Sequence, residues 1–525
     1  MTRFDLDLRD RRRLFADLER DVFDIAVIGA GITGAGIARD AAMRGFSVAL
    51  IEARDFAAGT SSRSTKLVHG GLRYLAQGDT RLVREASTER KVVKTIAPHL
   101  ARPIRFLLPA TSRAGVAKLS AGLWTYERLG GVEKEDRHEL WNGERLAREE
   151  PALVTDAISA AIVYTEYVTD DGRLTLANVR SAKGHGAIVA NYAEVRSVRS
   201  GALTVRDHLA HDGATATVRA RVIVNASGPW ADRIRQLEDP NADARLQLSK
   251  GVHLVLPRAR LPIHNTINVV AADKRGMFAI PRGDVVYVGT TDTFYRDCEY
   301  WPEITAADID YLLEATNRTF NGAPRTRADV CGYWAGIRPL IAEPGKSPSE
   351  ISRRDEVMVG PTGMITIAGG KLTAFRRMAE RVVDLCARRL DADARPCATA
   401  SELLPGADEA PADTVAGLES RGLPTRDADR LMRLYGSEAH DVVGEGVAGE
   451  VRQAVLKEGA ATLEDYWVRR SARAHFDVDG GLAVLDEAAT IMGGLLGWTA
   501  EARAEQLRVC RALAEDELQS LAKTA

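Results

Sequence analysis

Apolar and polar residues follow a regular pattern between residues 24 and 52. Four consecutive apolar residues at 25–28 predict a buried parallel strand. Apolar side chains then recur at helical spacing over 37–42, Gly45 ends the predicted helix, and 48–51 form a second apolar run. The pattern predicts a strand–helix–strand unit, which is typical of the α/β class.

Three glycines mark the turn between the first strand and the helix. In this G-x-G-x-x-G pattern Gly29 allows a tight turn, Gly31 lets a pyrophosphate approach the backbone, and Gly34 lets the helix pack closely on the strand. The helix N-terminus would then face the phosphates with unpaired N–H groups. Glu52 follows roughly 20 residues later, where a carboxylate accepts hydrogen bonds from ribose hydroxyls. We therefore expect bound FAD or NAD rather than NADP; a unit that uses its glycines only for packing is the alternative.

A polar segment follows at 59–75. It combines short hydroxyl side chains with two cations, Lys66 and Arg73, and with the pair Gly70–Gly71, which permits close backbone approach. We expect this loop to run beneath the cofactor towards its reactive end; a polar surface loop is the alternative.

Later segments extend the same organisation. Residues 222–228 form a strand that ends in a small polar turn, 254–293 contain short alternating strands typical of an antiparallel sheet, and 364–390 repeat the strand–glycine–helix pattern. Three prolines within 396–415 indicate a linker. Beyond the linker, helical periodicity predicts helices near 426–441, 448–475 and 499–522.

The bulk composition narrows the class of protein. A chain of 525 residues predicts two or three domains, and a net charge of −2 argues against a nucleic-acid partner. The five cysteines are scattered without a CxxC pair, which favours a reducing compartment and no structural zinc site. The first 24 residues do not resemble a signal peptide, and the chain contains no apolar run of the length that spans a bilayer. We expect a cytoplasmic protein with no bound metal.

Two amphipathic segments are candidates for contact with a membrane surface. Residues 1–20 are basic around Leu14, Phe15 and Leu18, and docking of these three side chains on the protein is the favoured alternative. Residues 111–130 carry apolar and basic side chains on one helix, and packing on the domain core is equally compatible with them.

Longer motifs resemble those of one family, the FAD-dependent glycerol-3-phosphate dehydrogenases of bacterial respiratory and mitochondrial type. The resemblance covers nearly all of the chain beyond residue 20. It is carried by GAGITGAGIARDAA (29–42), TSSRSTKLVHGGLRYL (60–75), APHLARPIRFLLP (97–109), TDDGRLTLAN (169–178), VNASGPWAD (224–232), SKGVHLVLP (249–257), DKRGMFAIPR (273–282), VGTTDT (288–293), YWAGIRPL (333–340), IAGGKLTAFR (367–376) and EDYWVRR (464–470). The C-terminal calcium-binding module of the mitochondrial members has no counterpart here, so the chain resembles the bacterial form.

The resemblance implies a fold and its division into domains. It implies a Rossmann-like FAD-binding domain, interleaved with an antiparallel β-sheet substrate domain, and a C-terminal α-helical domain. The expected parts are an N-terminal basic segment at 1–20; FAD-binding parts at about 21–100, 155–240 and 330–395; substrate parts at about 101–154 and 241–329; a linker at 396–415; and a helical domain at 416–525.

The resemblance also implies an activity. Such an enzyme oxidises sn-glycerol 3-phosphate to dihydroxyacetone phosphate by hydride transfer to N5 of non-covalent FAD, and it passes electrons to a membrane quinone. We therefore expect peripheral association with the inner face of the cell membrane. The alternatives are an O₂-dependent glycerophosphate oxidase of the same fold, an NAD-dependent dehydrogenase and a non-catalytic flavin-binding protein. The sequence leaves the oligomeric state open, with a homodimer as one option.

The chemistry requires a base for the hydroxyl proton and a cationic clamp for a phosphate dianion. The family positions that match are Arg73, Tyr74, His253, Arg338 and Lys371. Arg338 and Arg73 are the preferred phosphate or oxygen ligands. His253 is the preferred base because imidazole titrates near neutral pH, and Lys371 could serve instead or hold the flavin N1/O2 region.

The same motifs supply the expected cofactor contacts. His69 could attach a flavin covalently, as happens in other flavoproteins, but the resemblance implies non-covalent binding. The expected FAD-binding residues are Gly29, Gly31, Ile32, Thr33, Gly34, Glu52, Thr60, Ser61, Ser62, Ser64, Thr65, Lys66, Leu67, His69, Gly70, Gly71, Ala226, Gly228, Gly370, Lys371, Leu372 and Thr373.

Overall fold

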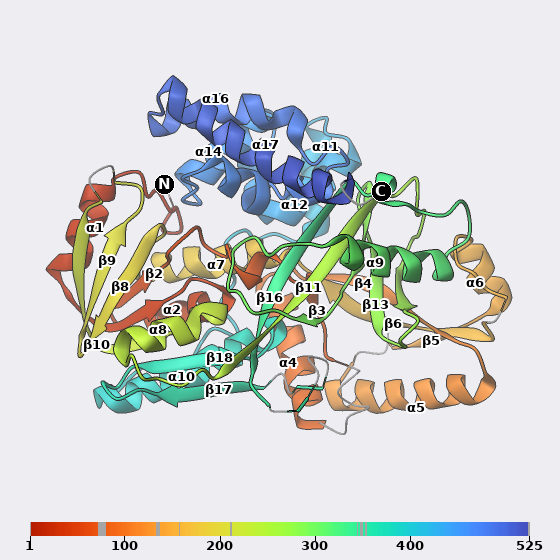
Figure 1. Ribbon diagram of the computed structural model, residues 1–525, viewed down its shortest axis with the longest axis horizontal. Coiled ribbons are helices and arrows are strands. Elements are labelled where there is room, and N and C mark those ends of the chain that lie inside the picture. Colours follow the sequence, from red (N-terminus) through yellow and green to blue (C-terminus); the bar gives the residue numbers. More distant parts are fainter. Residues whose placement is uncertain are drawn as a thin grey trace.

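The structure is a computed structural model in which two sheets lie side by side and a group of C-terminal helices runs along one side of both (Figure 1). It describes residues 2–71, 80–132, 137–156, 158–210, 213–343, 345–346, 350–351 and 354–522. Arg73 and Tyr74, two of the expected substrate ligands, lie outside the described residues.

The first sheet is mostly parallel and has eight strands in the described part of the chain. These are β1 (Val22–Ile28), β2 (Val48–Ile51), β7 (Ile188–Ala190), β8 (Ala193–Arg199), β9 (Ala202–Asp207), β10 (Thr215–Asn225), β17 (Asp355–Val359) and β18 (Ile365–Gly369). The order is β17-β18-β10-β1-β2-β7, and β8 and β9 extend from β10 as an antiparallel meander. Strand β1 pairs in parallel with β10 and β2, which confirms the predicted parallel strand.

Helices cover one face of this sheet, and the β8–β9 meander covers the other. The helices are α2 (Ile32–Met43), α7 (Asp171–Gly184) and α10 (Phe375–Leu390), whose apolar sides form one core with alternate residues of β1, β2, β10 and β18. Helix α1 (Arg11–Arg20) packs on the opposite core through Phe15 and Leu18, and Arg11 pairs with the buried Asp207 at 2.8 Å. The N-terminal basic segment is therefore docked on the protein, which confirms the favoured alternative.

The second sheet is mostly antiparallel and has ten strands among the described residues. These are β3 (Leu67–Val68), β4 (Arg102–Ala110), β5 (Glu139–Asn142), β6 (Ala160–Val168), β11 (Leu246–Pro257), β12 (Thr266–Val270), β13 (Gly276–Arg282), β14 (Val285–Gly289), β15 (Thr293–Phe294) and β16 (Gly332–Ile341). Helices α4 (Thr80–Ile96), α5 (Arg113–Gly130), α6 (Gly143–Glu149) and α9 (Ala306–Thr319) surround it, and α8 (Ala231–Glu238) lies beside the first sheet.

The two sheets are interleaved more finely than the sequence indicated. Strands β6 and β16 fall within segments assigned to the FAD-binding part, yet both belong to the second sheet. The physical reason is long-range pairing, because β6 runs antiparallel to β4 over the whole length of β4, and β16 pairs antiparallel with β11 over the whole length of β16. The expected boundaries near 155 and 330 therefore require correction to the ends of these two strands.

The C-terminal helices form the third part of the molecule. They are α11 (Pro411–Ser420), α12 (Thr425–Tyr435), α13 (Ala439–Val442), α14 (Val447–Leu456), the π-helix η7 (Asp465–Arg470), α15 (Arg473–Phe476), α16 (Leu485–Leu496) and α17 (Ala500–Ala522). The single helix expected over 448–475 is wrong, because Gly459 adopts a φ of +67° and a turn separates α14 from η7.

The expected linker is a packed connection rather than an extended spacer. Leu404 is buried and its N–H donates to the carbonyl of Ile96, while the buried Arg39 donates to the carbonyls of Thr399 and Glu402. The segment ends where α11 begins at Pro411, a few residues before the expected limit of 415.

The space around two helical glycines, Gly34 in α2 and Gly122 in α5, predicts opposite effects when each is replaced by alanine. A Cβ at Gly34 would lie 1.8 Å from the carbonyl oxygen of Gly29, so Gly34→Ala must displace the helix and should lower the free energy of unfolding by about 2–3 kcal/mol. A Cβ at Gly122 in α5 meets nothing within 4 Å, so Gly122→Ala should stabilise by about 1 kcal/mol. Thermal unfolding of both variants checks this, and equal melting temperatures would contradict it.

Candidate cofactor and substrate site

A cavity of about 900 Å³ lies at the carboxyl ends of the parallel strands of the first sheet. Ile28, Ile51, Ala226 and Gly369, from the ends of four neighbouring strands or just beyond them, all contribute to its wall. Ligands in open α/β sheets bind in this position, where strand ends and helix N-termini meet. The cavity therefore lies where the glycine motif predicts a dinucleotide.

The glycine turn leaves the start of α2 open towards this cavity. Gly29 has a φ of +96°, and a Cβ on it would lie 2.8 Å from the carbonyl oxygen of Ala226. Gly31 is the N-cap residue and has no side chain to cap the helix, while the N–H of Ile32 donates to the Ser61 hydroxyl at 2.9 Å. Gly31 and Thr33 both line the cavity. An open helix N-terminus beside backbone without Cβ atoms fits a pyrophosphate.

Glu52 lies at the tip of β2 and also lines the cavity. Its two carboxylate oxygens accept hydrogen bonds from the N–H groups of Ala30 at 2.7 Å and Arg54 at 2.9 Å, which fix its orientation. Burial raises the pKa of this carboxyl above its ordinary value. Since a carboxylate oxygen has two lone pairs, the side chain retains acceptor capacity for ribose hydroxyls.

The polar loop 59–71 contributes to the cavity only through its first part. Thr60 and Ser61 line the wall, whereas Lys66 turns into the protein and forms a buried ion pair of 2.5 Å with Asp171. Lys66 thus anchors the loop to α7. The other expected cofactor residues that do not contribute to this wall are Gly34, Ser62, Ser64, Thr65, Leu67, His69, Gly70, Gly71 and Thr373.

Several wall residues were not among the expected contacts. Trp230 stacks on Tyr300 with ring centroids 4.4 Å apart, and the Arg54 guanidinium lies 4.9 Å from the Tyr300 ring. All three line the cavity, as do Tyr192 and Thr462. Trp230 stands within a motif that the sequence singled out, but Thr462 comes from the C-terminal helices and no local pattern marks it.

A second group of expected residues gathers on one face of strands β11 and β16. Their register places Arg338 opposite Ser249, Gly336 opposite Gly251, and Trp334 opposite His253. Because side chains alternate along a strand, Arg338 and His253 project from the same face of the sheet. The structure therefore brings together two residues that are far apart in the sequence.

Buried acid and hydroxyl groups hold Arg338. Its guanidinium donates to the carboxylate of Asp292 at 2.9 Å and to the Thr290 hydroxyl at 3.1 Å. Arg275 pairs with the other oxygen of Asp292 at 2.6 Å. Two guanidinium groups therefore share this carboxylate.

His253 is buried and stacks on the Trp334 ring, with centroids 4.8 Å apart and planes 15° apart. Its Nε2 lies 2.9 Å from the Thr65 hydroxyl. Burial and the nearby Arg338 charge hold the pKa of this imidazole well below its ordinary value. The ring is therefore neutral at physiological pH and able to accept a proton.

Lys371 lines the end of the large cavity together with Gly370, Leu372 and Pro339, the neighbour of Arg338. Gly369 and Gly370 both have positive φ, and a Cβ on Gly370 would lie 2.4 Å from Met378. The cavity thus extends from Glu52 to the strand that carries Arg338. Among the described residues, no group of three or more His, Cys, Asp or Glu side chains is arranged to hold a metal ion.

Comparison with known proteins agrees with this geometry. A family model described as FAD dependent oxidoreductase matches residues 24–376, and one described as C-terminal domain of alpha-glycerophosphate oxidase matches residues 444–503. A relative from Bacillus subtilis named aerobic glycerol-3-phosphate dehydrogenase is 37% identical over 529 residues, which cover 94% of this chain and 95% of the relative.

Solved structures resemble the whole chain or its fold. The glycerol-3-phosphate dehydrogenase from Bacillus halodurans complexed with FAD is 32% identical with a TM-score of 0.82, and the match covers 98% of this chain and 99% of that one. The dithionite-reduced L-alpha-glycerophosphate oxidase from Mycoplasma pneumoniae with FAD bound is 17% identical with a TM-score of 0.56, and the match covers 73% of this chain and 99% of that one. The second likeness shows the fold alone.

The environment of Glu52 predicts that FAD affinity depends on pH. Ribose hydroxyls that donate to the carboxylate favour its charged form, so the bound state has a lower pKa than the raised pKa of the free protein. The affinity for FAD should therefore be highest above the raised pKa of Glu52 and should fall as the pH drops through that pKa, by up to about tenfold per pH unit. Quenching of flavin fluorescence between pH 7 and pH 5 measures this.

Two variants distinguish the role of Glu52 from that of another acid in the cavity wall. Glu52→Gln should bind FAD more weakly at pH 7 and lose the dependence on pH, because the amide does not titrate. Glu194→Gln removes another cavity-lining carboxylate and should keep the wild-type dependence. Persistence of the wild-type profile in Glu52→Gln would contradict the assignment.

Proposed function

The chain belongs to the FAD-dependent oxidoreductases and within them to the aerobic glycerol-3-phosphate dehydrogenase family, and from this premise we propose that it oxidises sn-glycerol 3-phosphate to dihydroxyacetone phosphate. The observation that carries the proposal is the common face of β11 and β16, on which the Arg338 guanidinium and the His253 imidazole lie together, while β16 also contributes Pro339 to the wall of the cofactor cavity. Bound FAD supplies the hydride acceptor at N5.

Arg338 binds the substrate phosphate in this proposal. Its guanidinium is held in place by Asp292 and Thr290, so little side-chain freedom is lost on binding. Because Arg275 shares the same carboxylate, the pair of cations favours a dianion over a neutral ligand. A planar guanidinium also binds a phosphate with two parallel hydrogen bonds, which orients the carbon chain.

His253 takes the hydroxyl proton in this proposal, and Lys371 is the alternative. The neutral imidazole has a lone pair that can accept a proton, although its low pKa makes it a weaker base, and Trp334 fixes the plane of the ring by stacking. Lys371 lies in the cavity wall, and its ammonium group fits the flavin N1/O2 region, where negative charge develops.

Anaerobic titration with glycerol 3-phosphate tests the function. The wild-type flavin should bleach as substrate is added, because two electrons enter the ring without an acceptor to remove them. Arg338→Ala should keep FAD bound but lower kcat/KM by about 100-fold, since a charge-assisted contact to the phosphate is lost. Flavin absorbance followed in a stopped-flow instrument provides both the extent and the rate of bleaching.

Further variants make this titration specific. Arg260→Ala removes another Arg–Asp pair, with Asp329, and should bleach like the wild type. If His253 is the base, His253→Gln should slow bleaching by about 10²–10⁴-fold at saturating substrate. If Lys371 is the base, Lys371→Met should slow bleaching by the same factor. A wild-type protein that stays yellow would contradict the function itself.

The C-terminal family model favours one second candidate, an oxidase that returns electrons to O₂. The whole-length relatives are named dehydrogenases, so we favour a membrane quinone as acceptor. The two are distinguished by mixing the substrate-reduced protein with O₂ or with a soluble quinone analogue. Stoichiometric hydrogen peroxide and slow quinone reduction would support the oxidase.

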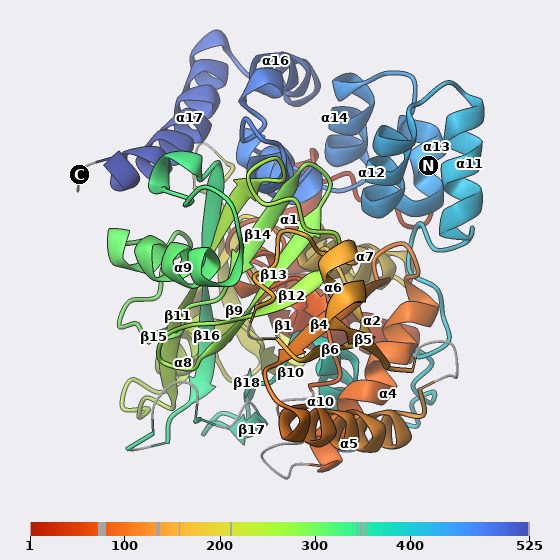
Figure 2. The same ribbon diagram turned by 90° about the vertical axis from the view of Figure 1, so that its right-hand side faces the viewer.

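We also propose that α5 contacts the cytoplasmic membrane, where the quinone resides. Trp124 on this helix is 54% exposed, the Arg128 guanidinium lies 4.7 Å from its ring, and Arg113 and Lys118 are exposed on the same helix. Helix α5 runs along the edge of the molecule opposite the C-terminal helices in both views (Figures 1 and 2). Exposed tryptophan among basic residues is typical of helices that lie on anionic bilayers. Among the helices that the structure describes, none is both long and apolar enough to cross a bilayer.

Trp124→Ser should weaken binding to vesicles that contain phosphatidylglycerol by about tenfold, because an indole ring is no longer buried at the interface. Co-sedimentation at several lipid concentrations measures the affinity. Val478→Ser changes another exposed apolar residue, in the turn after α15, and should bind like the wild type. Equal losses in the two variants would refute a specific role of α5.

A further inference from the structure

The C-terminal helices reach the wall of the cofactor cavity. Thr462, in the turn between α14 and η7, lines the cavity beside Tyr192, and their side-chain oxygens lie 3.2 Å apart. Tyr192 is close to the tip of β2, because its N–H donates to the carbonyl of Arg54 and the N–H of Ala193 donates to the carbonyl of Glu52. The end of the cavity that suits the ribose and adenine therefore includes a residue from the last domain.

The buried Asp465 fixes the position of Thr462. Its carboxylate accepts hydrogen bonds from the N–H groups of Ala461 at 2.8 Å and Thr462 at 3.0 Å. The Tyr192 hydroxyl donates to the same carboxylate at 2.7 Å. One acid thus holds both the turn and the tyrosine that face the cavity.

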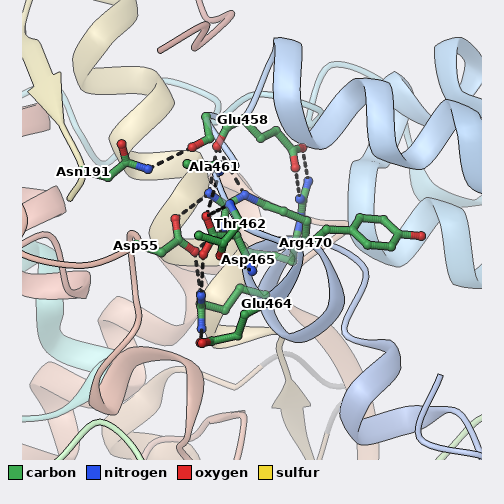
Figure 3. A network of polar contacts seen from close by, with 12 residues as sticks. Asp55, Asn191, Glu458, Ala461, Thr462, Glu464, Asp465 and Arg470 are labelled. Carbon is green, nitrogen blue, oxygen red and sulfur yellow. Dashed lines mark hydrogen bonds and ion pairs between the residues drawn. The ribbon is translucent and has the colours of Figure 1, made fainter. Parts of the chain in front are cut away.

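A second buried acid, Asp55, ties the loop after Glu52 to the same helix (Figure 3). Asp55 accepts from Arg469 at 2.5 Å and from Arg470 at 2.7 and 2.8 Å. Arg469 also donates to Asp465 at 2.8 Å, so it joins the two carboxylates. The loop held in this way includes Arg54, Ala58 and Gly59, which line the cavity.

This cluster differs from an ordinary bridge between domains. Arg173 of α7 and Glu458 form an equally buried pair, with contacts of 2.5 and 2.7 Å, and they too join the C-terminal helices to the rest of the protein. Neither of these two residues lines the cofactor cavity. If the only role of buried ion pairs were to hold the domains together, both sites would affect the cofactor alike.

We propose that the turn and π-helix at 461–470 are a functional part of the FAD site. Thr462 contacts the adenosine half of the cofactor, and Asp55, Arg469 and Asp465 act as positioning residues for Thr462, Tyr192 and the loop after Glu52. Binding of FAD and docking of the C-terminal helices are consequently linked, so that each strengthens the other. The inference depends on FAD binding and not on the identity of the substrate.

The rate of FAD release from the holoenzyme tests this proposal. Flavin fluorescence rises as FAD leaves after dilution, and no substrate is required. Thr462→Val and Tyr192→Phe should each release FAD about fivefold faster, because each removes one hydroxyl and no charge. Thr462→Ser retains the hydroxyl and should release FAD at the wild-type rate. Asp55→Asn should release it at least about tenfold faster.

Glu458→Gln is the matched control for a buried ion pair of the C-terminal helices and should stay within about twofold of the wild-type rate. Limited trypsin digestion of the C-terminal helices gives an independent readout: added FAD should slow cleavage of the wild type and do so less for Thr462→Val. Wild-type release from both Thr462→Val and Tyr192→Phe would overturn the proposal, as would equal acceleration in Glu458→Gln and Asp55→Asn. A protein that passes these tests but fails to oxidise glycerol 3-phosphate would refute only the proposed function.

Discussion

The close crossing of α2 over the end of β1 is the constraint on which the cofactor site depends. Gly34 faces the carbonyl oxygen of Gly29 at a distance that leaves no room for a Cβ. This contact brings the open N-terminus of α2 to the strand ends, where the cavity wall is formed by backbone and by Glu52. A wider crossing would carry the N–H groups away from the phosphates, and the positive end of the helix would lose its effect within one turn.

Buried ion pairs then hold the remaining parts against this framework. The pair of Lys66 and Asp171 anchors the polar loop, and the pair of Arg173 and Glu458 joins α7 to the turn after α14. Asp55 forms ion pairs with two arginines. Such pairs contribute little net stability relative to apolar side chains, but an unpaired charge in the same place costs several kcal/mol, so they favour one arrangement of the chain over others. On the common face of β11 and β16 the arrangement is different, because two arginines, Arg275 and Arg338, pair with the same carboxylate, that of Asp292.

Local patterns in the sequence were sufficient for part of this architecture. The strand, glycine turn, helix and acid between residues 24 and 52 are neighbours in both sequence and space, so periodicity and spacing predicted them. The assignment of β6 and β16 to the second sheet could not be derived in this way, since it depends on pairing with β4 and β11, where paired residues lie 50 or more positions apart. Thr462 and Asp55 show the same limit, because Thr462 lies 270 residues from Tyr192 in the sequence and Arg470 lies 415 residues from Asp55.

Glycines of the second sheet explain why Arg338 and His253, which are far apart in the sequence, lie together on one face of that sheet. A Cβ on Gly251 would lie 2.3 Å from the Arg338 guanidinium, and one on Gly289 would lie 2.2 Å from the His253 ring. Both functional side chains therefore lie flat over glycine backbone instead of standing away from the sheet. Burial and the nearby Arg338 charge both lower the pKa of this imidazole and favour its neutral form. The side chain that would hold the phosphate therefore lies close to the group that would take the proton, and this arrangement suits a ligand with a hydroxyl a few atoms from a phosphate.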